Sequence, residues 1–467
     1  MELSLIHEAN VSLLSSYLRA GESFDIIERH LAVAGDDVCF FYVDGFTKDS
    51  EMQRLMQYLL SKKELADADT LVKDLPYIEV GLGENIERIA VAVLSGQTAV
   101  LSSAFPSESV LIDARTYPAR STEEPSSDRV MQGSRDGFVE TLVMNTALIR
   151  RRIRDPRLVM RHFDIGGSSH TDVVLCYMDG IADGRLVKDI ADRLRRIKPD
   201  GVCLGHRSIA ESLIRKGWLN PFPKIRLTER PDTASAQLLE GSVLIISDTS
   251  PEVMILPTSI FDYLQQTDDY YFPPLTGSYL RIVRTVILLL SVILTPVWYL
   301  CLEYSHTLPD YLTFLVPDDP GALPIIFQLL LVEVAIDGLK IASMNTPDML
   351  SNSLSVVGAL LLGDFAVGVG WVCEDVILYM SFVAIAGFAQ QNVELGYAFK
   401  FVRVAMLILT YLLGTWGIIA GALLFILLVS TNVTLSGRGY LYPLIPFDGR
   451  AMCRLLFRVK KNDVPKE

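Results

Sequence analysis

The chain has 467 residues, a net charge of −13 and a mean hydropathy of +0.33, with 50% hydrophobic but only 21% charged residues. Residues 1–280 contain 30 basic and 41 acidic residues, residues 281–430 contain 5 and 11, and residues 431–467 contain 7 and 3. This uneven distribution excludes a single globular domain, a disordered chain and a basic nucleic-acid-binding protein, and it indicates a soluble half, an apolar half and a short basic tail.

The first 280 residues alternate short β-branched runs with amphipathic stretches, which predicts a soluble half of α/β fold in two subdomains. The strand-like runs are Val38–Val43, Ile89–Leu94, Val110–Ile112, Val173–Cys176, Lys224–Leu227 and Val243–Ile246. The helix-like stretches are Gly137–Arg154, Ala182–Ile197 and Ser208–Lys216. Turn-forming residues at 116–133 indicate a linker. We therefore expect soluble subdomains at 1–130 and 131–275, a transmembrane helical domain at 276–435 and a basic cytosolic tail at 436–467.

The apolar half contains several runs long enough to be membrane helices. The first, Thr285–Leu302, carries no charge and follows Arg281 and Arg284, so the positive-inside rule places the soluble half in the cytosol. Further candidates are Leu323–Ala342, Leu354–Val372, the shorter Val376–Ala389, and Val404–Ser430, which is long for one crossing and short for two. Because Lys400, Arg403 and the basic tail all favour the cytosolic side, either one run is not a true crossing or Val404–Ser430 enters and returns.

Three acidic residues fall within these apolar runs. Glu333 and Asp337 have helical spacing on one face, and Asp364 lies near the middle of its run. A carboxylate at mid-bilayer costs at least about 2.5 kcal/mol unless it faces water or a partner. We therefore interpret the three as pore or gating candidates. The alternative is that Lys340 or a neighbouring chain neutralises them structurally.

No catalytic pattern or metal-ligand spacing appears, so we expect no enzymatic activity, no metal and no cofactor. The six cysteines are scattered, and the six histidines are isolated in sequence. The Asp44-Gly45 and Asp179-Gly180 pairs could be metal or phosphate loops, but strand-to-helix turns are the simpler interpretation. The arginine run at 150–154 could bind phosphate or a lipid headgroup, although a solvated helix end or a contact between subunits is favoured.

One long segment resembles a known family. Residues 133–158 read GSRDGFVETLVMNTALIRRRIRDPRL, which is similar to the hallmark sequence of the A subunits of bacterial spore germinant receptors, the GerA type. The matching residues that we assign to the family motif or an interface are Gly133, Arg135, Gly137, Phe138, Glu140, Asn145, Arg150 and Arg152. Gln132, Ser134 and Asp136 depart from the family pattern, which puts the usual contacts with a partner subunit in doubt.

The apolar run and the tail extend this resemblance to most of the chain. LSVVGALLLGDFAV at 354–367 resembles a family membrane motif in which Asp364 replaces glutamate, and YLYPLIPFDGRAMCRLLFR at 440–458 resembles the stage V sporulation AF-type branch. The resemblance implies an integral protein of the spore inner membrane with a two-part cytosolic domain. It also implies contact with membrane lipid, self-association into a homo-oligomer, and other spore inner-membrane germination proteins as partners.

Two hypotheses for the function follow, and a secondary transporter is a weaker third. The first is an oligomeric subunit that conducts ions, or is associated with a channel, and promotes ion release during germination. The second is a non-conducting membrane scaffold or signal transducer that binds other germination proteins. The sequence shows no inverted repeat of the kind that would favour a transporter.

Overall fold

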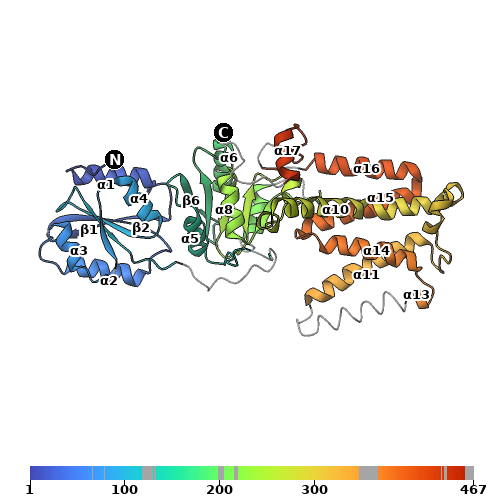
Figure 1. Cartoon of the computed structure of the whole chain (residues 1–467), viewed down its shortest axis with the longest axis horizontal. Helices are drawn as coiled ribbons and strands as arrows, with labels where there is room; N and C mark the ends of the chain where they lie inside the picture. Colours follow the sequence, from blue (N-terminus) through green and yellow to red (C-terminus); the bar gives the residue numbers. More distant parts are fainter. Residues whose placement is uncertain are drawn as a thin grey trace. The chain divides into compact units, whose positions relative to one another are not determined.

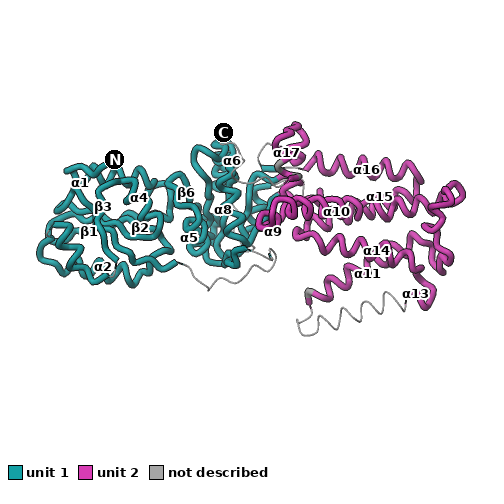
Figure 2. Tube along the Cα trace, in the orientation of Figure 1, with its two compact units in different colours: residues 1–216, 225–258, 434–438 teal, residues 217–224, 259–433, 439–467 magenta. Residues whose placement is uncertain are grey.

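The computed structural model describes residues 1–65, 67–77, 79–117, 130, 133–197, 205–214, 219–345, 366–432, 434–435 and 439–457. The chain divides into two compact units, which Figure 2 shows in different colours. Unit 1 comprises residues 1–216, 225–258 and 434–438. Unit 2 comprises residues 217–224, 259–433 and 439–467.

Unit 1 contains two five-stranded sheets (Figure 1). The first has the order β1-β2-β4-β5-β3, and the second has the order β6-β7-β9-β10-β8. The strands of the first sheet are β1 (Ile26–Val33), β2 (Asp36–Val43), β3 (Val80–Gly83), β4 (Thr98–Ser102) and β5 (Ser109–Ile112). Those of the second are β6 (Leu158–Ile165), β7 (Thr171–Met178), β8 (Arg226–Thr228), β9 (Val243–Ser247) and β10 (Val253–Leu256).

Helices cover both faces of each sheet. On the first sheet, the core on one face includes residues of α1 (His7–Leu18) and α4 (Ile86–Leu94), and the core on the other includes residues of α2 (Asp49–Leu60) and α3 (Ala68–Asp74). On the second sheet, α5 (Leu142–Arg152) and α8 (Pro231–Leu239) share one core, and α6 (Gly184–Arg195) and α7 (His206–Leu213) share the other. The predicted layers of helix and strand are therefore present.

The two halves of unit 1 repeat one architecture. The first runs α1-β1-β2-α2-α3-β3-α4-β4-β5, and the second runs α5-β6-β7-α6-α7-β8-α8-β9-β10. Strand β2 ends in Tyr-Val-Asp-Gly and β7 in Tyr-Met-Asp-Gly, and both glycines have positive φ (80° at Gly45, 77° at Gly180). The two Asp-Gly pairs thus occupy equivalent turns, each between a strand and a helix.

Two details differ from the sequence prediction. Neighbouring strands are antiparallel throughout both sheets, whereas an α/β alternation is typical of parallel sheets. The strand predicted at Ile89–Leu94 is wrong, because these residues lie in helix α4. Asn85 caps this helix by accepting a hydrogen bond from the Glu87 N–H, and Ile86, Ile89, Ala90 and Val93 form its buried face, which is a helical spacing.

Unit 2 is helical. Its long helices are α10 (Pro274–Glu303), α11 (Ile325–Asn345), α14 (Glu374–Phe388), α15 (Val393–Leu413) and α16 (Thr415–Ser430). Among its described residues, the shorter elements are α9 (Asp268–Tyr271), α13 (Ala366–Gly368), α17 (Gly449–Leu456) and the 3₁₀ helices η1 (Ile260–Tyr263), η2 (Ser305–Thr307) and η3 (Asp310–Leu315). Helix α10 packs against α14 and α15, and α11 packs against α14. Most of the predicted run Leu354–Val372 lies outside the described residues.

Among the described residues, α10 and α15 are the two helices that are long and apolar enough to cross a membrane. The predicted run Val404–Ser430 is not one helix, because the chain turns at Gly414, which has φ 58°. Helix α16 then packs back along α15: a Cβ at Gly417 would lie 2.1 Å from the Leu409 oxygen, and one at Gly421 would lie 2.6 Å from Met406 Cγ. Gly417 and Gly421 therefore serve close helix packing.

Candidate functional site

The strongest candidate site is a cluster of four charged residues between α11 and α15. Glu333 and Asp337 lie one turn apart on α11, and Lys400 and Arg403 lie one turn apart on α15. Arg403 Nη2 donates to Glu333 Oε1 at 2.5 Å. Lys400 Nζ lies 3.3 Å from the same oxygen and also forms an ion pair with Asp337. Two carboxylates and two cations thus neutralise each other inside a helical unit.

The cluster is largely shielded from solvent, and it is anchored to a third helix. The side chains of Glu333 and Arg403 are 10% and 8% exposed, whereas that of Asp337 is 33% exposed. Arg403 Nη1 donates to the Ser291 carbonyl of α10 at 3.3 Å, while its Nε has no hydrogen-bond partner among the described residues. Ion pairs with this little water contact are sensitive to the loss of either partner.

The sequence prediction found the acids of this cluster but missed the cations. The alternative interpretation gives Lys340 or a neighbouring chain as the source of the counter-charge, but the Lys340 ammonium lies over the Tyr397 ring, 4.8 Å from the centroid. Lys400 and Arg403 were interpreted only as markers of membrane orientation. A signal was available, since both cations adjoin the apolar run and have the spacing that complements Glu333 and Asp337. The third candidate, Asp364, lies outside the described residues.

A second ionic cluster joins the start of α10 to the tail. Asp269 is fully buried, and Arg284 Nη2 and Arg281 Nε lie 3.1 and 3.4 Å from its carboxylate oxygens. Arg281 Nη1 also donates to the Leu455 carbonyl of α17 at 2.6 Å. Arg281, which precedes the first apolar run, therefore lies at the same end of unit 2 as helix α17 of the tail.

The arginine run in the family motif forms contacts within unit 1. Arg150 is completely buried, and its Nε donates to Asp25 Oδ2 at 2.7 Å. Its Nη2 donates to Asp25 Oδ1, to Ser23 Oγ and to the Leu158 carbonyl, while its Nη1 donates to the Asp155 carbonyl. Since Ser23 and Asp25 precede β1 and Arg150 lies on α5, this network ties the two halves of unit 1 together.

The placement of Arg150 differs from the predicted solvated helix end and from the predicted phosphate or lipid site, although Arg151 and Arg154 of the same run are exposed. The Arg150 side chain is neither solvated nor available to phosphate or lipid, because Asp25 occupies its guanidinium. Arg151 stacks over the Tyr117 ring at 4.7 Å from the centroid, and Arg154 lies 3.4 Å from Ser95 Oγ. No local sequence pattern linked Arg150 to a carboxylate 125 residues earlier in the chain.

Two residues that depart from the family motif, Ser134 and Asp136, both contact Arg152. Its Nη2 donates to Asp136 Oδ2 at 2.6 Å and to Ser134 Oγ at 3.0 Å, and the Ser134 hydroxyl also bonds the Asp136 carboxylate. Burial opposes ionisation of Asp136, but the hydrogen bonds from Arg152 and Ser134 prevail and hold its pKa below the ordinary value. Ser134 and Asp136 thus form one interaction with Arg152.

The remaining motif residues shape the segment that leads into α5. Asn145 is fully buried and bonds both backbone groups of Val139, accepting from its N–H at 2.8 Å and donating to its carbonyl at 2.6 Å. Gly137 and Phe138 are buried, whereas Gly133, Arg135 and Glu140 are exposed. The buried members of the motif stabilise unit 1, and the exposed members are the ones available to another molecule.

A protein-family model described as Bacillus/Clostridium GerA spore germination protein matches residues 14–466 of the chain. The chain is 36% identical over 448 residues to stage V sporulation protein AF of Bacillus subtilis (strain 168), covering 94% of this chain and 90% of that protein. It is 27% identical over 469 residues to spore germination protein A1 of the same organism, covering 99% of this chain and 95% of the relative.

One solved structure is also similar, the N-terminal domain of the A subunit of the Bacillus megaterium spore germinant receptor GerK3. It is 25% identical, covers 55% of this chain and 96% of that chain, and has a TM-score of 0.42. The match of the family model over nearly the whole chain, together with the relative at 36% identity, confirms the resemblance of the hallmark segment. The chain belongs to the GerA family of spore germination proteins.

Proposed function

We propose that this protein is a membrane subunit of the spore germination machinery, and that its unit 2 conducts ions or controls their passage when germination begins. The observation that carries the proposal is the four-charge cluster of Glu333, Asp337, Lys400 and Arg403 between apolar helices. Charged side chains at membrane depth are costly, and they are typical of ion pathways and gates.

The remaining parts of the proposal concern location and assembly. Unit 2 would cross the spore inner membrane several times, in contact with lipid, and unit 1 would face the cytosol. The bond from Arg281 to the Leu455 carbonyl and the α15–α16 hairpin support an even number of crossings, because they bring the start of α10 and the tail to the same end of unit 2. We further propose that the protein is not an enzyme and that it forms a homo-oligomer.

The names of the relatives support a role in sporulation and germination. The protein at 36% identity is named for stage V of sporulation, and the other curated relative is named for spore germination. We propose other spore inner-membrane germination proteins as partners. The exposed motif residues Arg135 and Glu140 are candidates for contacts with them, since the buried motif residues are committed to unit 1.

A second candidate function is a non-conducting scaffold or signal transducer. The observation that favours it is the pairing itself, because Glu333 and Asp337 each have a cationic partner in unit 2. Buried pairs of this kind can hold helices in register without any ion passing between them. The two functions differ in what happens to the pairs during germination.

Ion flux from liposomes separates the two functions. The full chain would be reconstituted into potassium-loaded liposomes, and potassium release would be compared for the wild type, Glu333→Gln and Asp310→Asn. Asp310 is an exposed acid at the start of η3 and serves as the matched control. We expect the wild type to release potassium. Glu333→Gln should change the rate of release about tenfold or more, in line with the cost of unpairing a buried ion, whereas Asp310→Asn should leave the rate unchanged.

Liposomes that stay tight with all three proteins would contradict the conducting function and favour the scaffold. The oligomeric state in mild detergent provides a second measurement. A closed ring supports a pore, whereas a monomer contradicts it.

A further inference from the structure

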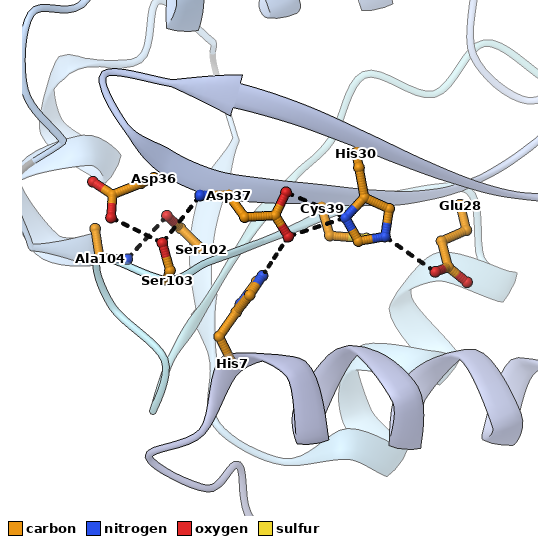
Figure 3. A network of polar contacts seen from close by, with 9 residues as sticks. All are labelled: His7, Glu28, His30, Asp36, Asp37, Cys39, Ser102, Ser103 and Ala104. Carbon is orange, nitrogen blue, oxygen red and sulfur yellow. Dashed lines mark hydrogen bonds and ion pairs between the residues drawn. The ribbon is translucent and has the colours of Figure 1, made fainter.

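The β1–β2 hairpin of the first sheet brings together three side chains, each of which offers a different kind of metal-binding atom. Glu28 and His30 are two residues apart on β1, so they lie on the same face of the sheet. The strand register places His30 directly opposite Cys39 of β2. Figure 3 shows the His30 ring between the Glu28 carboxylate on one side and the Asp37 carboxylate on the other. A carboxylate, an imidazole and a thiol therefore converge.

The separations between these ligand atoms fit one metal ion. His30 Nε2 lies 3.3 Å from Glu28 Oε1 and 3.6 Å from Cys39 Sγ, and the three ligand atoms are all within 4.8 Å of one another. Around tetrahedral zinc, bonds of about 2.0–2.3 Å give ligand separations of about 3.3 Å between nitrogen and oxygen and about 3.6 Å between nitrogen and sulfur. The two separations from His30 Nε2 therefore match those between zinc ligands.

A second layer of hydrogen bonds holds the candidate ligands in place. His30 Nδ1 bonds Asp37 Oδ2 at 3.0 Å, which leaves Nε2 as the atom that can carry a lone pair toward a metal. The same Asp37 oxygen contacts His7 Nε2 of α1 at 3.1 Å. The other oxygen of Glu28 accepts a hydrogen bond from Ser15 Oγ at 2.5 Å. A carboxylate that orients a metal-binding histidine is typical of zinc sites.

The second half of unit 1 provides an internal comparison. In its equivalent hairpin, β6–β7, His162 occupies the strand position of His30, and its Nε2 contacts Asp172 at 2.8 Å, whereas His30 contacts Asp37 through Nδ1. The positions equivalent to Glu28 and Cys39 hold Met160 and Val174. The histidine–aspartate pair is therefore common to both halves, whereas the carboxylate and thiol beside the histidine belong to the first half alone.

We propose that Glu28, His30 and Cys39 bind one zinc ion, with a fourth, exchangeable ligand completing the tetrahedron. Binding would release the Cys39 thiol proton, and any proton on His30 Nε2, to solvent, so that one thiolate and one carboxylate balance the charge of the ion. Cys39 itself is buried, but the His30 and Glu28 side chains are 49% and 28% exposed, which gives the ion access from solvent. The site would link β1 to β2, and it does not depend on the function proposed for unit 2.

Sequence reasoning missed this site because its ligands have no recognisable spacing. His30 and Cys39 are nine residues apart on two strands, and only the register of the hairpin brings them together. The proposal departs from the expectation that the chain binds no metal, which rested on sequence spacing alone.

Cobalt binding tests the proposal, because a Co²⁺–thiolate bond produces a charge-transfer absorption that zinc then displaces. The full chain in detergent would be treated with a chelator under reducing conditions and titrated with Co²⁺. We expect one cobalt per chain, loss of the charge-transfer band in Cys39→Ser, and affinity reduced about 10–100-fold in Asp37→Asn. The partly exposed Glu28→Ala variant should fold normally and also lose affinity.

Two variants in the second half serve as matched controls. Cys176→Ser removes another buried strand cysteine, and His162→Ala removes the histidine of the equivalent hairpin. Both should bind cobalt as the wild type does. Absence of a thiolate band in the wild type, or a band that persists in Cys39→Ser, would overturn the proposal.

Discussion

Two of the buried ionic networks in this protein, the Arg150–Asp25 pair in unit 1 and the four-charge cluster in unit 2, neutralise their charges in different ways. In unit 1, one guanidinium meets one carboxylate, and the Arg150–Asp25 pair is completed by Ser23 Oγ and two backbone carbonyls. In unit 2, two cations meet two carboxylates across two helices, and Arg403 Nε has no partner among the described residues. We call the first network closed, because its polar groups have partners, and the second network open, because Arg403 Nε lacks a hydrogen bond among the described residues.

This difference determines whether the ion pairs of each network stay fixed or can exchange partners. A buried pair whose donors and acceptors are all satisfied loses several kcal/mol if it opens, so it acts as a fixed connection. A cluster with shared partners can exchange one pairing for another at lower cost, because Lys400 already contacts both Glu333 and Asp337. We infer that unit 1 is joined rigidly through Arg150 and that the charges of unit 2 are the ones able to rearrange.

The largest effect is expected from opening the closed network. Asp25→Asn leaves the buried Arg150 without its counter-ion, which should destabilise unit 1 by about 3–5 kcal/mol and lower the melting temperature by about 10 °C. Arg154→Ala is the control, because Arg154 is exposed on the same stretch of chain. Thermal unfolding of the full chain in detergent measures both. Equal melting temperatures for the two variants would show that the pair does not join the halves.

A smaller effect is expected from disturbing the packing that positions Arg403. Gly417→Leu would force a side chain against the Leu409 carbonyl of α15, which should cost about 1–3 kcal/mol or separate the hairpin. The control is Gly396→Ala on α15, since nothing lies within 4 Å of a Cβ at Gly396. The melting temperature of unit 2 is the measurement, and tolerance of leucine at 417 would contradict the close approach of the helices.

Within the open network, the two acids should differ. Glu333 contacts both Lys400 and Arg403, whereas Asp337 contacts Lys400 alone and is more exposed. We therefore expect Asp337→Asn to change potassium release from liposomes about threefold, less than the change for Glu333→Gln, because exposed ion pairs contribute about 1 kcal/mol or less. A larger effect of Asp337→Asn would place the control of ion passage at the Lys400 end of the cluster.

The smallest effect concerns pH. Since the pKa of Asp136 is lowered in the folded protein, its ion pair with Arg152 adds stability above the ordinary aspartate pKa of about 3.9, and this is lost as the pH falls through the folded-state value. Asp136→Asn should therefore lose less stability on acidification than the wild type. Melting temperatures between pH 3 and 7, with Asp136→Asn, Arg152→Gln and the double variant, measure this coupling. Additive effects of the two changes would contradict it.

The sequence predicted features that depend on local pattern. It located five of the ten strands described in unit 1 (β2, β5, β7, β8 and β9), the apolar helices of unit 2 and the family, because these follow from periodicity, hydropathy or a long motif. Its error at Ile89–Leu94 arose because a short apolar run of β-branched residues suits a strand or a buried helix equally. Asn85 and Glu87 at the start of α4 were the signals that would have decided for the helix.

Features that depend on distant residues could not be predicted in the same way. Arg150 meets Asp25 from 125 residues away, and Glu333 meets Arg403 from 70 residues away. The repeated architecture of unit 1 was likewise hidden, because the two halves share few identical residues beyond the Asp-Gly turns at 44–45 and 179–180. The charge of Glu333 marked it as a candidate, and the spacing of Lys400 and Arg403 was compatible with pairing, but the packing of α11 against α15 was needed to identify the partner.

The most direct test of the central claim is cation release from spores in which the Glu333–Arg403 pair is neutralised or reversed. We predict that Glu333→Gln changes the rate of potassium release at germination, and that the double variant Glu333→Arg with Arg403→Glu restores it toward the wild-type rate, because the pair is re-formed with opposite polarity. Release indistinguishable from the wild type in Glu333→Gln spores, with the protein present at the normal level, would contradict the claim that this cluster controls ion passage.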